Sequence, residues 1–583
     1  MKTFNVHIET IAAGSEAATE LTIPAPADGG VSLADVLRRH GLPLNTRCGQ
    51  RGLCHGCTVD LVAGELAPMR QGHFPQSCSV RSTPDCLAGL LASRVPRDNN
   101  VKTAPGPSIC ADEQSQPVRA CDYRPASDLH IIIPQSSLLT YAPQVLDGYA
   151  IRITHARNPL VDARFGVAVD VGTTTVALML VDLADGQVVA RASSFNAQMH
   201  LGDDVITRIT QCMNDPTMLR QMQTAIADRT IAPLLGEAMQ AAGANAQDIG
   251  AMVIAGNTTM LHLLAGVDPS PLGVSPFTPR FTEHRILAGG DLLAGWASAF
   301  PRMQVHLLPS ASAFIGADIV AGLVATAMSY EPETSLLVDV GTNGEIVLRH
   351  GERFVGCATA AGPAFEGARL ASGMRAGDGA ISALALDPQT GNHQIEWIGR
   401  ERSPRPAGLC GSAYIDFLAE GRRTGLLSAT GRFADFENSP GGWRRQSLGA
   451  SCQIAMGQGH RPIIVSECDV ASLLSAKAAI QAGVQLLLAN QTLQPRDVRH
   501  VFLAGGFGTH MNARNAIAIG MLPGFCAEQI VPVGNTALAG AYLALTDKAL
   551  LADMKETAGS VEALELNLIP EFQDAYIDGL SLE

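Results

Sequence analysis

The sequence predicts a multidomain α/β protein with a small N-terminal domain and a large, two-lobed C-terminal domain. The chain has 583 residues, which at roughly 100 to 200 residues per domain corresponds to about three or four structural units. Four cysteines lie close together, between Cys48 and Cys78. A strand–turn–strand pattern that contains the sequence Asp-x-Gly-Thr occurs twice, with its aspartates at Asp170 and Asp339, 169 positions apart.

The composition excludes several classes of protein. With 46% hydrophobic and 16% charged residues, the chain is typical of globular enzymes and not of disordered proteins. Its 55 acidic and 41 basic residues give a net charge of −14, and no stretch concentrates Lys and Arg, so nucleic acid is not an expected partner. The N-terminal residues lack the apolar core of a signal peptide, and no run approaches the ~18 to 20 apolar residues of a membrane span. We therefore expect a cytoplasmic protein without a membrane partner.

The cysteine spacing near the N-terminus indicates a metal cluster. Cys48, Cys54 and Cys57 are separated by five and then two residues, and Cys78 follows after another twenty. Glycines at 49, 52 and 56 would let the backbone fold around a cluster and direct N–H groups at thiolates and sulfides. The spacing resembles that of [2Fe–2S] ferredoxins, and it is closer to the variant with five intervening residues than to the plant-type four.

The flanking pattern agrees with such a domain over residues 1–92. Apolar residues alternate over 4–8, Ser32 precedes an apolar helical face and Gly41 follows it, and a second alternating strand begins near Val59. The order strand, helix, cysteine loop, strand is that of a β-grasp ferredoxin. Two alternatives stay open at this point: four cysteines can also bind structural zinc, and Cys86 could replace Cys78 as the fourth ligand.

A flexible linker and a small middle segment are predicted next. Residues 93–128 contain five prolines, many polar residues and no apolar period, which is typical of a mobile tether. Its two cysteines, Cys110 and Cys121, are interpreted as thiols that bind no cluster. Residues 129–163 contain two short apolar segments, which predict strands of a small middle unit.

The duplicated motif predicts a site that binds phosphate groups. Its first copy is a strand at 165–171 and a strand at 176–181, and its second is a strand at 336–340 and a strand at 346–348. The turns between these strands contain Gly172, Thr173, Thr174 and Thr175 in one copy and Gly341, Thr342 and Asn343 in the other. Glycine lets the backbone approach phosphate oxygens, and Thr hydroxyls can bond to them. The strand-end carboxylates, Asp170 and Asp339, can hold hydrated Mg²⁺ or orient a water.

A third apolar strand, 501–504, leads into the glycines Gly505, Gly506 and Gly508, as a contact with adenosine would require. Two phosphate loops and a glycine-rich adenosine loop in this order resemble the superfamily of actin, Hsp70 and the sugar kinases. The resemblance implies that residues 164–583 form a two-lobed ATPase domain with a C-terminal extension, which binds ATP and Mg²⁺.

The combination of a [2Fe–2S] motif with this ATPase core resembles the reductive activators of corrinoid-dependent methyltransferases. Further stretches match that family, at 256–262, 360–368, 373–376, 408–412, 534–536 and 570–572. The resemblance covers nearly the whole chain. The segment between the linker and the ATPase core is shorter than the middle domain that the family leads us to expect.

This resemblance implies a function. Such proteins return the inactive Co(II) state of a corrinoid protein to Co(I), with an electron from the cluster and with ATP supplying the energy that the cluster potential lacks. The implied partners are a corrinoid protein of a methyltransferase system and an upstream low-potential electron donor, and a homodimer is one assembly that the resemblance allows. Two other functions remain open: an electron carrier whose ATPase core is only a scaffold, and a small-molecule kinase with a redox-sensing domain.

Overall fold

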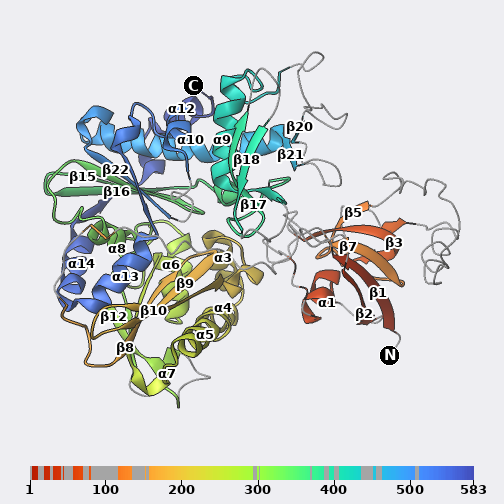
Figure 1. The fold of residues 1–583 in the computed structure, drawn as a ribbon, viewed down its shortest axis with the longest axis horizontal. Coiled ribbons are helices and arrows are strands. Elements are labelled where there is room, and N and C mark those ends of the chain that lie inside the picture. The colour runs from red at the N-terminus through yellow and green to blue at the C-terminus, as the bar shows by residue number, and fades with distance from the viewer. Residues whose placement is uncertain are drawn as a thin grey trace, which may run out of the picture. The chain divides into compact units, whose positions relative to one another are not determined.

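The computed structural model divides the chain into two compact units, Met1–Tyr141 and Ala142–Glu583 (Figure 1). It describes residues 3–10, 19–26, 31–40, 42, 44, 57–69, 78–80, 116–133, 151–152, 157–292, 298–300, 303–367, 370–386, 393–399, 406–434, 451–454, 463–505 and 511–582.

The first unit is built on a mixed sheet with the strand order β2-β1-β7-β3-β4. Its elements are β1 (Thr3–Thr10), β2 (Thr19–Pro26), α1 (Leu33–Arg39), β3 (Thr58–Pro68), β4 (Cys78–Val80), β5 (Gln116–Arg119), β6 (Tyr123–Pro125) and β7 (Leu129–Ile133). A hairpin of β1 and β2, a helix, and a central parallel pair of β1 and β7 form the order of a β-grasp sheet. The hydroxyl of Ser32 accepts a hydrogen bond from the N–H of Asp35 (3.1 Å) and so caps α1.

Strand β3 bends back on itself. Its first residues pair with β5, where Thr58 lies opposite Arg119, and its last residues pair with β6, where Pro68 lies opposite Tyr123. Only four residues lead from Arg119 to Tyr123, and these can span at most about 14 Å. The two ends of β3 must therefore lie close together, and Gly64, with φ +105°, lies between them.

These pairings change the domain boundaries expected from the sequence. Residues 116–128 were predicted as linker, but β5 and β6 pair with β3. Residues 129–133 were predicted to begin a middle segment, but they form β7, the strand between β1 and β3. The later part of the predicted middle segment, from residue 142, belongs to the second unit. Composition favoured a tether here because it reports polarity, whereas long-range strand pairing decides whether a polar segment is ordered.

The second unit contains two sheets that share a five-stranded topology; the sixth strand differs, because β12 pairs antiparallel with β13 in the first sheet and β24 pairs parallel with β16 in the second. The first has the order β10-β9-β8-β11-β13-β12 and the second β23-β22-β14-β15-β16-β24. Their strands are β8 (Phe165–Val171), β9 (Thr175–Asp182), β10 (Val188–Phe195), β11 (Ile249–Gly256), β12 (Arg285–Ala288), β13 (Gln304–Leu307), β14 (Ser335–Val340), β15 (Gly344–His350), β16 (Arg353–Thr359), β22 (His500–Ala504), β23 (Ile530–Gly534) and β24 (Val561–Ala563). In each sheet three antiparallel strands are followed by two parallel ones.

The register confirms the duplication that the sequence predicts. Asp170 of β8 lies opposite Ala255 of β11, and Asp339 of β14 lies opposite Ala504 of β22. β8 and β14 are central and buried along nearly their whole length, which explains their almost continuous apolar sequence. The two aspartates therefore occupy equivalent positions near the carboxyl ends of equivalent strands.

Two helices pack between these sheets, α8 (Ala317–Ala325) and α13 (Thr536–Thr546), as Figure 1 shows. α13 follows a strand of the second sheet but packs on β8 and β11 of the first. α8 and α13 pack closely because α13 has a glycine at the contact: a Cβ at Gly540 would lie 2.4 Å from the Cβ of Ala321. α8 thus contributes side chains to the cores of both lobes, and α13 packs against it from the first lobe.

The remaining helices cover the outer faces and the edges. In the first lobe they are α3 (Val205–Asn214), α4 (Met218–Ile226), α5 (Ala232–Ala242), α6 (Thr258–Leu264), α7 (Gly289–Leu292) and α14 (Lys548–Ser560), which packs on α8 and α13, and in the second α9 (Gly411–Arg423), α10 (Glu467–Asn490), α12 (Ala513–Ala518) and α15 (Phe572–Asp578). Short strands accompany α9 and α10: β17 (Ala380–Leu386), β18 (His393–Trp397), β19 (Gly408–Leu409), β20 (Ser451–Ile454) and β21 (Ile463–Ser466).

By length and composition α10 alone among the described helices could span a membrane, but 78% of its apolar window is buried inside the protein, as in a core helix.

The pairing of β7 predicts how fragments of the chain behave. A fragment 1–141 is expected to fold, whereas a fragment 1–92 is expected to remain unfolded because it lacks β7, which joins β1 to β3. Circular dichroism and amide-proton dispersion in NMR spectra would distinguish the two. A cooperatively folded 1–92 fragment would contradict the role of β7.

Candidate functional site

One cavity of the second unit brings together both copies of the duplicated motif. It encloses about 240 Å³ at the carboxyl ends of β8 and β14. The predicted site residues that line it are Asp170, Gly172, Thr173, Thr174, Thr175, Asp339, Gly341, Thr342, Asn343 and Gly505. Gly506 and Gly508, predicted to contact adenosine, lie outside the described residues.

Both turns are closed by the N–H of their glycine. Gly172 donates to the carbonyl of Thr175 (2.9 Å), and Gly341 donates to the carbonyl of Asn343 (2.9 Å). A Cβ at Gly172 would lie 2.7 Å from the Thr175 carbonyl oxygen, so the first turn admits only glycine without moving its backbone. This close approach is the physical reason for the Gly-Thr sequence.

The first turn is held from behind by buried side chains. Arg208 donates through its terminal nitrogen to the Thr173 carbonyl (2.5 Å), and Asn196 donates to the Gly172 carbonyl (2.9 Å). Asn257, which caps α6, donates to the Thr173 hydroxyl (3.0 Å). Burial lowers the pKa of Arg208 to about 10, so the guanidinium still carries its charge at neutral pH. The loop is therefore rigid before any ligand binds.

Four half-buried carboxyl groups line the cavity. Burial raises the pKa of Asp170 to about 7 and that of Asp318 to about 6. Burial, together with the nearby charges of Asp318 and Asp170, raises the pKa of Asp339 to about 7. Burial also raises the pKa of Glu345 well above its ordinary value. The side chain of Asn535 donates a hydrogen bond to Asp170 (2.8 Å), which partly offsets the rise in the pKa of Asp170. Such a group of carboxyls favours a bound cation, because a cation offsets their mutual repulsion.

This arrangement fits a hydrated Mg²⁺ with a nucleotide. Within the described part of the chain, no three His, Cys, Asp or Glu side chains are placed so that they could hold a metal ion directly. Mg²⁺ commonly keeps several waters and is held by one or two carboxylates together with substrate phosphates. Asp170 and Asp339, which line the cavity beside the two glycine turns, provide that number of carboxylates.

Gly505 brings the third predicted strand to the same cavity. It follows β22, has φ +86°, and a Cβ there would lie 2.7 Å from an Oδ1 of Asp339 and 3.1 Å from the Val340 carbonyl oxygen. Both the left-handed backbone and the close approach require glycine. The glycine that follows β22 is thus explained by its close approach to the carboxylate of Asp339 in β14.

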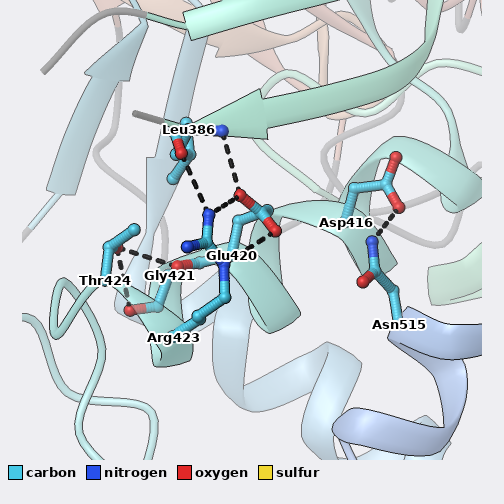
Figure 2. A network of polar contacts seen from close by, with 7 residues as sticks. All are labelled: Leu386, Asp416, Glu420, Gly421, Arg423, Thr424 and Asn515. Atoms are coloured by element: carbon cyan, nitrogen blue, oxygen red, sulfur yellow. Dashed lines mark hydrogen bonds and ion pairs between the residues drawn. The ribbon is translucent and has the colours of Figure 1, made fainter. Parts of the chain in front are cut away.

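A polar network holds the helix that closes one side of the cavity. α9 begins beside the cavity, where Cys410, Gly411 and Ser412 line it. Figure 2 shows Asp416 and Glu420 of this helix, which accept hydrogen bonds from Asn515 of α12 (2.7 Å) and from the Leu386 N–H of β17 (3.1 Å). These bonds fix the position of the α9 N-terminus.

Glu366 connects the two turns, and Arg375 lies beside it. Glu366 accepts hydrogen bonds from the hydroxyls of Thr174 (3.0 Å) and Thr342 (2.5 Å), one from each turn. Arg375 lines the cavity next to Glu366, with 3.6 Å between its Nε and the Glu366 carboxylate. The two glycine turns are therefore bridged by the carboxylate of Glu366.

Of the predicted cluster ligands the structure describes two. Cys57 is buried at the start of β3, and Cys78 begins β4, where it lies opposite Leu66 of β3. β4 thus pairs with residues 64–66 of the strand that Cys57 precedes. Cys48, Cys54 and the alternative ligand Cys86 lie outside the described residues.

Cys121 differs from its predicted place in a linker. It is buried in the core of the first unit, and the N–H of the preceding Ala120 donates to the Cys57 carbonyl (3.0 Å). Composition could not reveal this position, because it results from the pairing of β5 and β6 with β3.

The motif analysis missed several side chains of the cavity. Asp318 comes from α8 and Glu345 from β15, directly after the second turn. Glu366 and Arg375 lie inside stretches that match the resembled family, but the sequence assigned them no role. Their acidic or basic character alone gave no signal, because it does not show which charges face one cavity.

A substitution at Gly505 tests the close approach to Asp339. Gly505→Ala should abolish Mg-ATP binding and destabilise the chain by more than the ~1–2 kcal/mol that a left-handed alanine costs. Gly351→Ala is the matched control, because Gly351 has φ +62° with open space around its Cβ position. Urea unfolding and calorimetric titration with Mg-ATP measure both effects; equal effects of the two variants would contradict the assignment.

The raised pKa values predict a pH dependence of stability without nucleotide. The folded chain binds the protons of Asp170 and Asp339 with pKa values of about 7, against 3.8 ordinarily. Binding these protons more tightly in the folded state raises the free energy of unfolding. This gain is complete below pH ~4 and is lost as the pH rises through ~7. Urea unfolding should show that Asp339→Asn reduces this loss by at least about 1.4 kcal/mol, the equivalent of one pKa unit. The exposed control Asp574→Asn should leave the loss of stability with pH unchanged. If Asp339→Asn also leaves it unchanged, burial does not raise the pKa of Asp339 as stated.

The comparisons with known proteins agree with this architecture. Residues 165–331 match the model of the RACo middle region, and residues 333–583 match the model of the C-terminal, ASKHA domain of RACo. The middle region of the family thus corresponds to the first lobe, and not to the shorter segment 129–163 predicted as a middle unit.

Three individual proteins resemble the chain over different lengths. The corrinoid activation enzyme RamQ of Eubacterium limosum is 29% identical, over 94% of this chain and 95% of its own length. The [Co(II) methylated amine-specific corrinoid protein] reductase of Methanosarcina barkeri is 29% identical, over 48% of this chain and 51% of its own. The solved structure of a reductive activator for corrinoid, iron–sulfur protein covers 99% of this chain and 98% of its own, with a TM-score of 0.67 and 27% identity. The chain therefore belongs to the RACo family of corrinoid-protein reductive activators.

Proposed function

We propose that the protein is an ATP-dependent reductive activator, which returns the inactive Co(II) state of a corrinoid protein of a methyltransferase system to Co(I). The observation that carries this proposal is the meeting of both glycine turns and both strand-end aspartates in one cavity. The names of the similar proteins, an activation enzyme, a reductase and a reductive activator, agree with it.

The second unit would bind the nucleotide. We assign the phosphates to Gly172, Thr173, Thr174 and Thr175 and to Gly341, Thr342 and Asn343, and the adenosine to Gly505, Gly506 and Gly508. Asp170 and Asp339 would hold a hydrated Mg²⁺ between them and the phosphates. Because Arg208, Asn196 and Asn257 hold the first turn in place, these donors need little rearrangement when the nucleotide arrives.

The first unit would carry the redox centre. Four thiolates, from Cys48, Cys54, Cys57 and Cys78, are the donor set of a [2Fe–2S] cluster. The burial of Cys57 directly before β3 and the pairing of β4, which begins at Cys78, with the same strand support this assignment. When bound, a cluster of this kind supplies one electron at a potential of about −400 mV in its plant-type form. The low-potential donor upstream, the cytoplasmic location and a homodimer stay predictions.

Nucleotide binding would be coupled to reduction by movement of the two lobes. The cavity lies between them, α8 packs against the sheets on both sides, and α13 packs against α8 and the first sheet. Closing the lobes on ATP would change how the protein binds its corrinoid partner, and the partner affinity is then the quantity that ATP alters.

The proposal is tested by following the cobalt of the partner. The protein is reduced anaerobically and mixed with a Co(II) corrinoid protein, and the Co(II) and Co(I) absorption bands are recorded with and without Mg-ATP. We expect ATP-dependent conversion to Co(I), lost in Asp339→Ala although its cluster spectrum is normal, and lost in Cys54→Ala together with that spectrum. Cys468→Ala, at an exposed thiol, should behave like the wild type.

The outcomes distinguish the alternatives. Full activation by Asp339→Ala would contradict the nucleotide assignment. Reduction without any ATP turnover would favour an electron carrier with a scaffold domain. A phosphorylated small molecule, with no effect on any corrinoid protein, would favour a kinase with a redox sensor.

A further inference from the structure

Glu366 occupies a position between the two phosphate turns. It ends a short 3-10 helix, Pro363–Glu366. One carboxylate oxygen accepts the hydroxyl of Thr342 (2.5 Å), and the other accepts the hydroxyl of Thr174 (3.0 Å). The carboxylate of Glu366, an anion with two oxygens, is thus held by the same threonines that are assigned to the phosphates of a nucleotide.

A threonine hydroxyl has one proton to donate. Thr174 and Thr342 therefore cannot donate to Glu366 and to a phosphate oxygen at the same time. The carboxylate and a phosphate group also repel each other when both are ionised. Binding of phosphate between the turns and the observed bonds of Glu366 are mutually exclusive.

Arg375 is the cation beside this position. Its side chain is only 8% exposed, and its Nε makes no hydrogen bond to any described residue. This nitrogen lies 3.6 Å from Oε2 of Glu366, which is within ion-pair distance but beyond a hydrogen bond, and the guanidinium lies over the ring of Phe195. A buried donor without an acceptor costs free energy, so the site is incomplete until an anion moves closer to Arg375.

We infer that Arg375 binds the terminal phosphate of the nucleotide and that Glu366 holds the place of this phosphate while the site is free of nucleotide. The inference rests on the proposed ATP-binding function and deepens it, because it names the residues that distinguish a triphosphate from a diphosphate. Arg375 matches such a role chemically, since a guanidinium presents several donors in a plane to phosphate oxygens.

The two residues belong to one packed segment. Gly367, directly after Glu366, has φ +71°, and a Cβ there would lie 2.3 Å from the carbonyl oxygen of Met374, the neighbour of Arg375. The Met374 N–H in turn donates to the Leu409 carbonyl (2.8 Å), just before α9. Displacement of Glu366 by phosphate would therefore move the backbone next to Arg375 and to the start of α9.

The test measures the binding of Mg-ATP and Mg-ADP to the full chain by calorimetry. Arg375→Gln should weaken the binding of Mg-ATP about tenfold or more, as loss of a charged hydrogen bond predicts, and change that of Mg-ADP by less than about threefold. Arg375→Lys should recover part of the preference for ATP. Arg432→Gln removes the same charge at an exposed position and should change neither affinity. Melting temperatures and circular dichroism show that each variant is folded.

A second variant tests the role of Glu366. Glu366→Gln removes the negative charge, so it should tighten the binding of Mg-ATP and of inorganic phosphate by about threefold or more. Weaker binding would show that Glu366 is itself a ligand of the nucleotide and would overturn the place-holding role. An unchanged ATP-to-ADP ratio in Arg375→Gln would overturn the phosphate assignment. If the wild type binds no Mg-ATP, the proposed function itself fails, so the two failures are distinguishable.

Discussion

The gathering of several half-buried carboxylates in one cavity is the constraint on which the second unit depends. Asp170 and Asp339 end equivalent strands of two equivalent sheets, and burial raises their pKa values to about 7. The surrounding structure serves this arrangement: Gly505 makes room for Asp339, Asn535 donates to Asp170, and Arg208 holds the turn that follows β8. A site of this kind is poised to bind a cation together with an anion, because each offsets the charge of the other.

The cavity and the cysteine motif belong to separate units, so in the proposed function the electron and the nucleotide would be handled by different parts of the chain. The first unit is a sheet whose strand β3 bends at Gly64 and meets residues from 116 to 133. The second unit has two lobes whose cores both contain residues of α8. A change at the cavity can therefore act on both lobes through this common helix, which is what the proposed coupling of ATP to partner binding would require.

Much of the second unit could be predicted because its motif is local and repeated. The strand, glycine and threonine of each copy follow from nearest neighbours in the sequence, and the structure confirms the strands and their duplication. Asp318, Glu366 and Arg375 could not be assigned in this way, because they reach the cavity from a helix and from loops distant in the sequence. The boundary near residue 116 was wrong for a similar reason: its strands are stabilised by pairing with residues 58–68.

The sequence by itself determined which functional groups are available: four cysteines at a spacing typical of clusters, two Gly-Thr turns, and an aspartate at the end of each preceding strand. These are properties of short segments, and short segments carry them wherever they lie. Only the tertiary structure decided which groups face each other. It placed Glu366 between Thr174 and Thr342 and left Arg375 buried beside it, because the distance between side chains depends on how the two sheets pack and not on their separation along the chain.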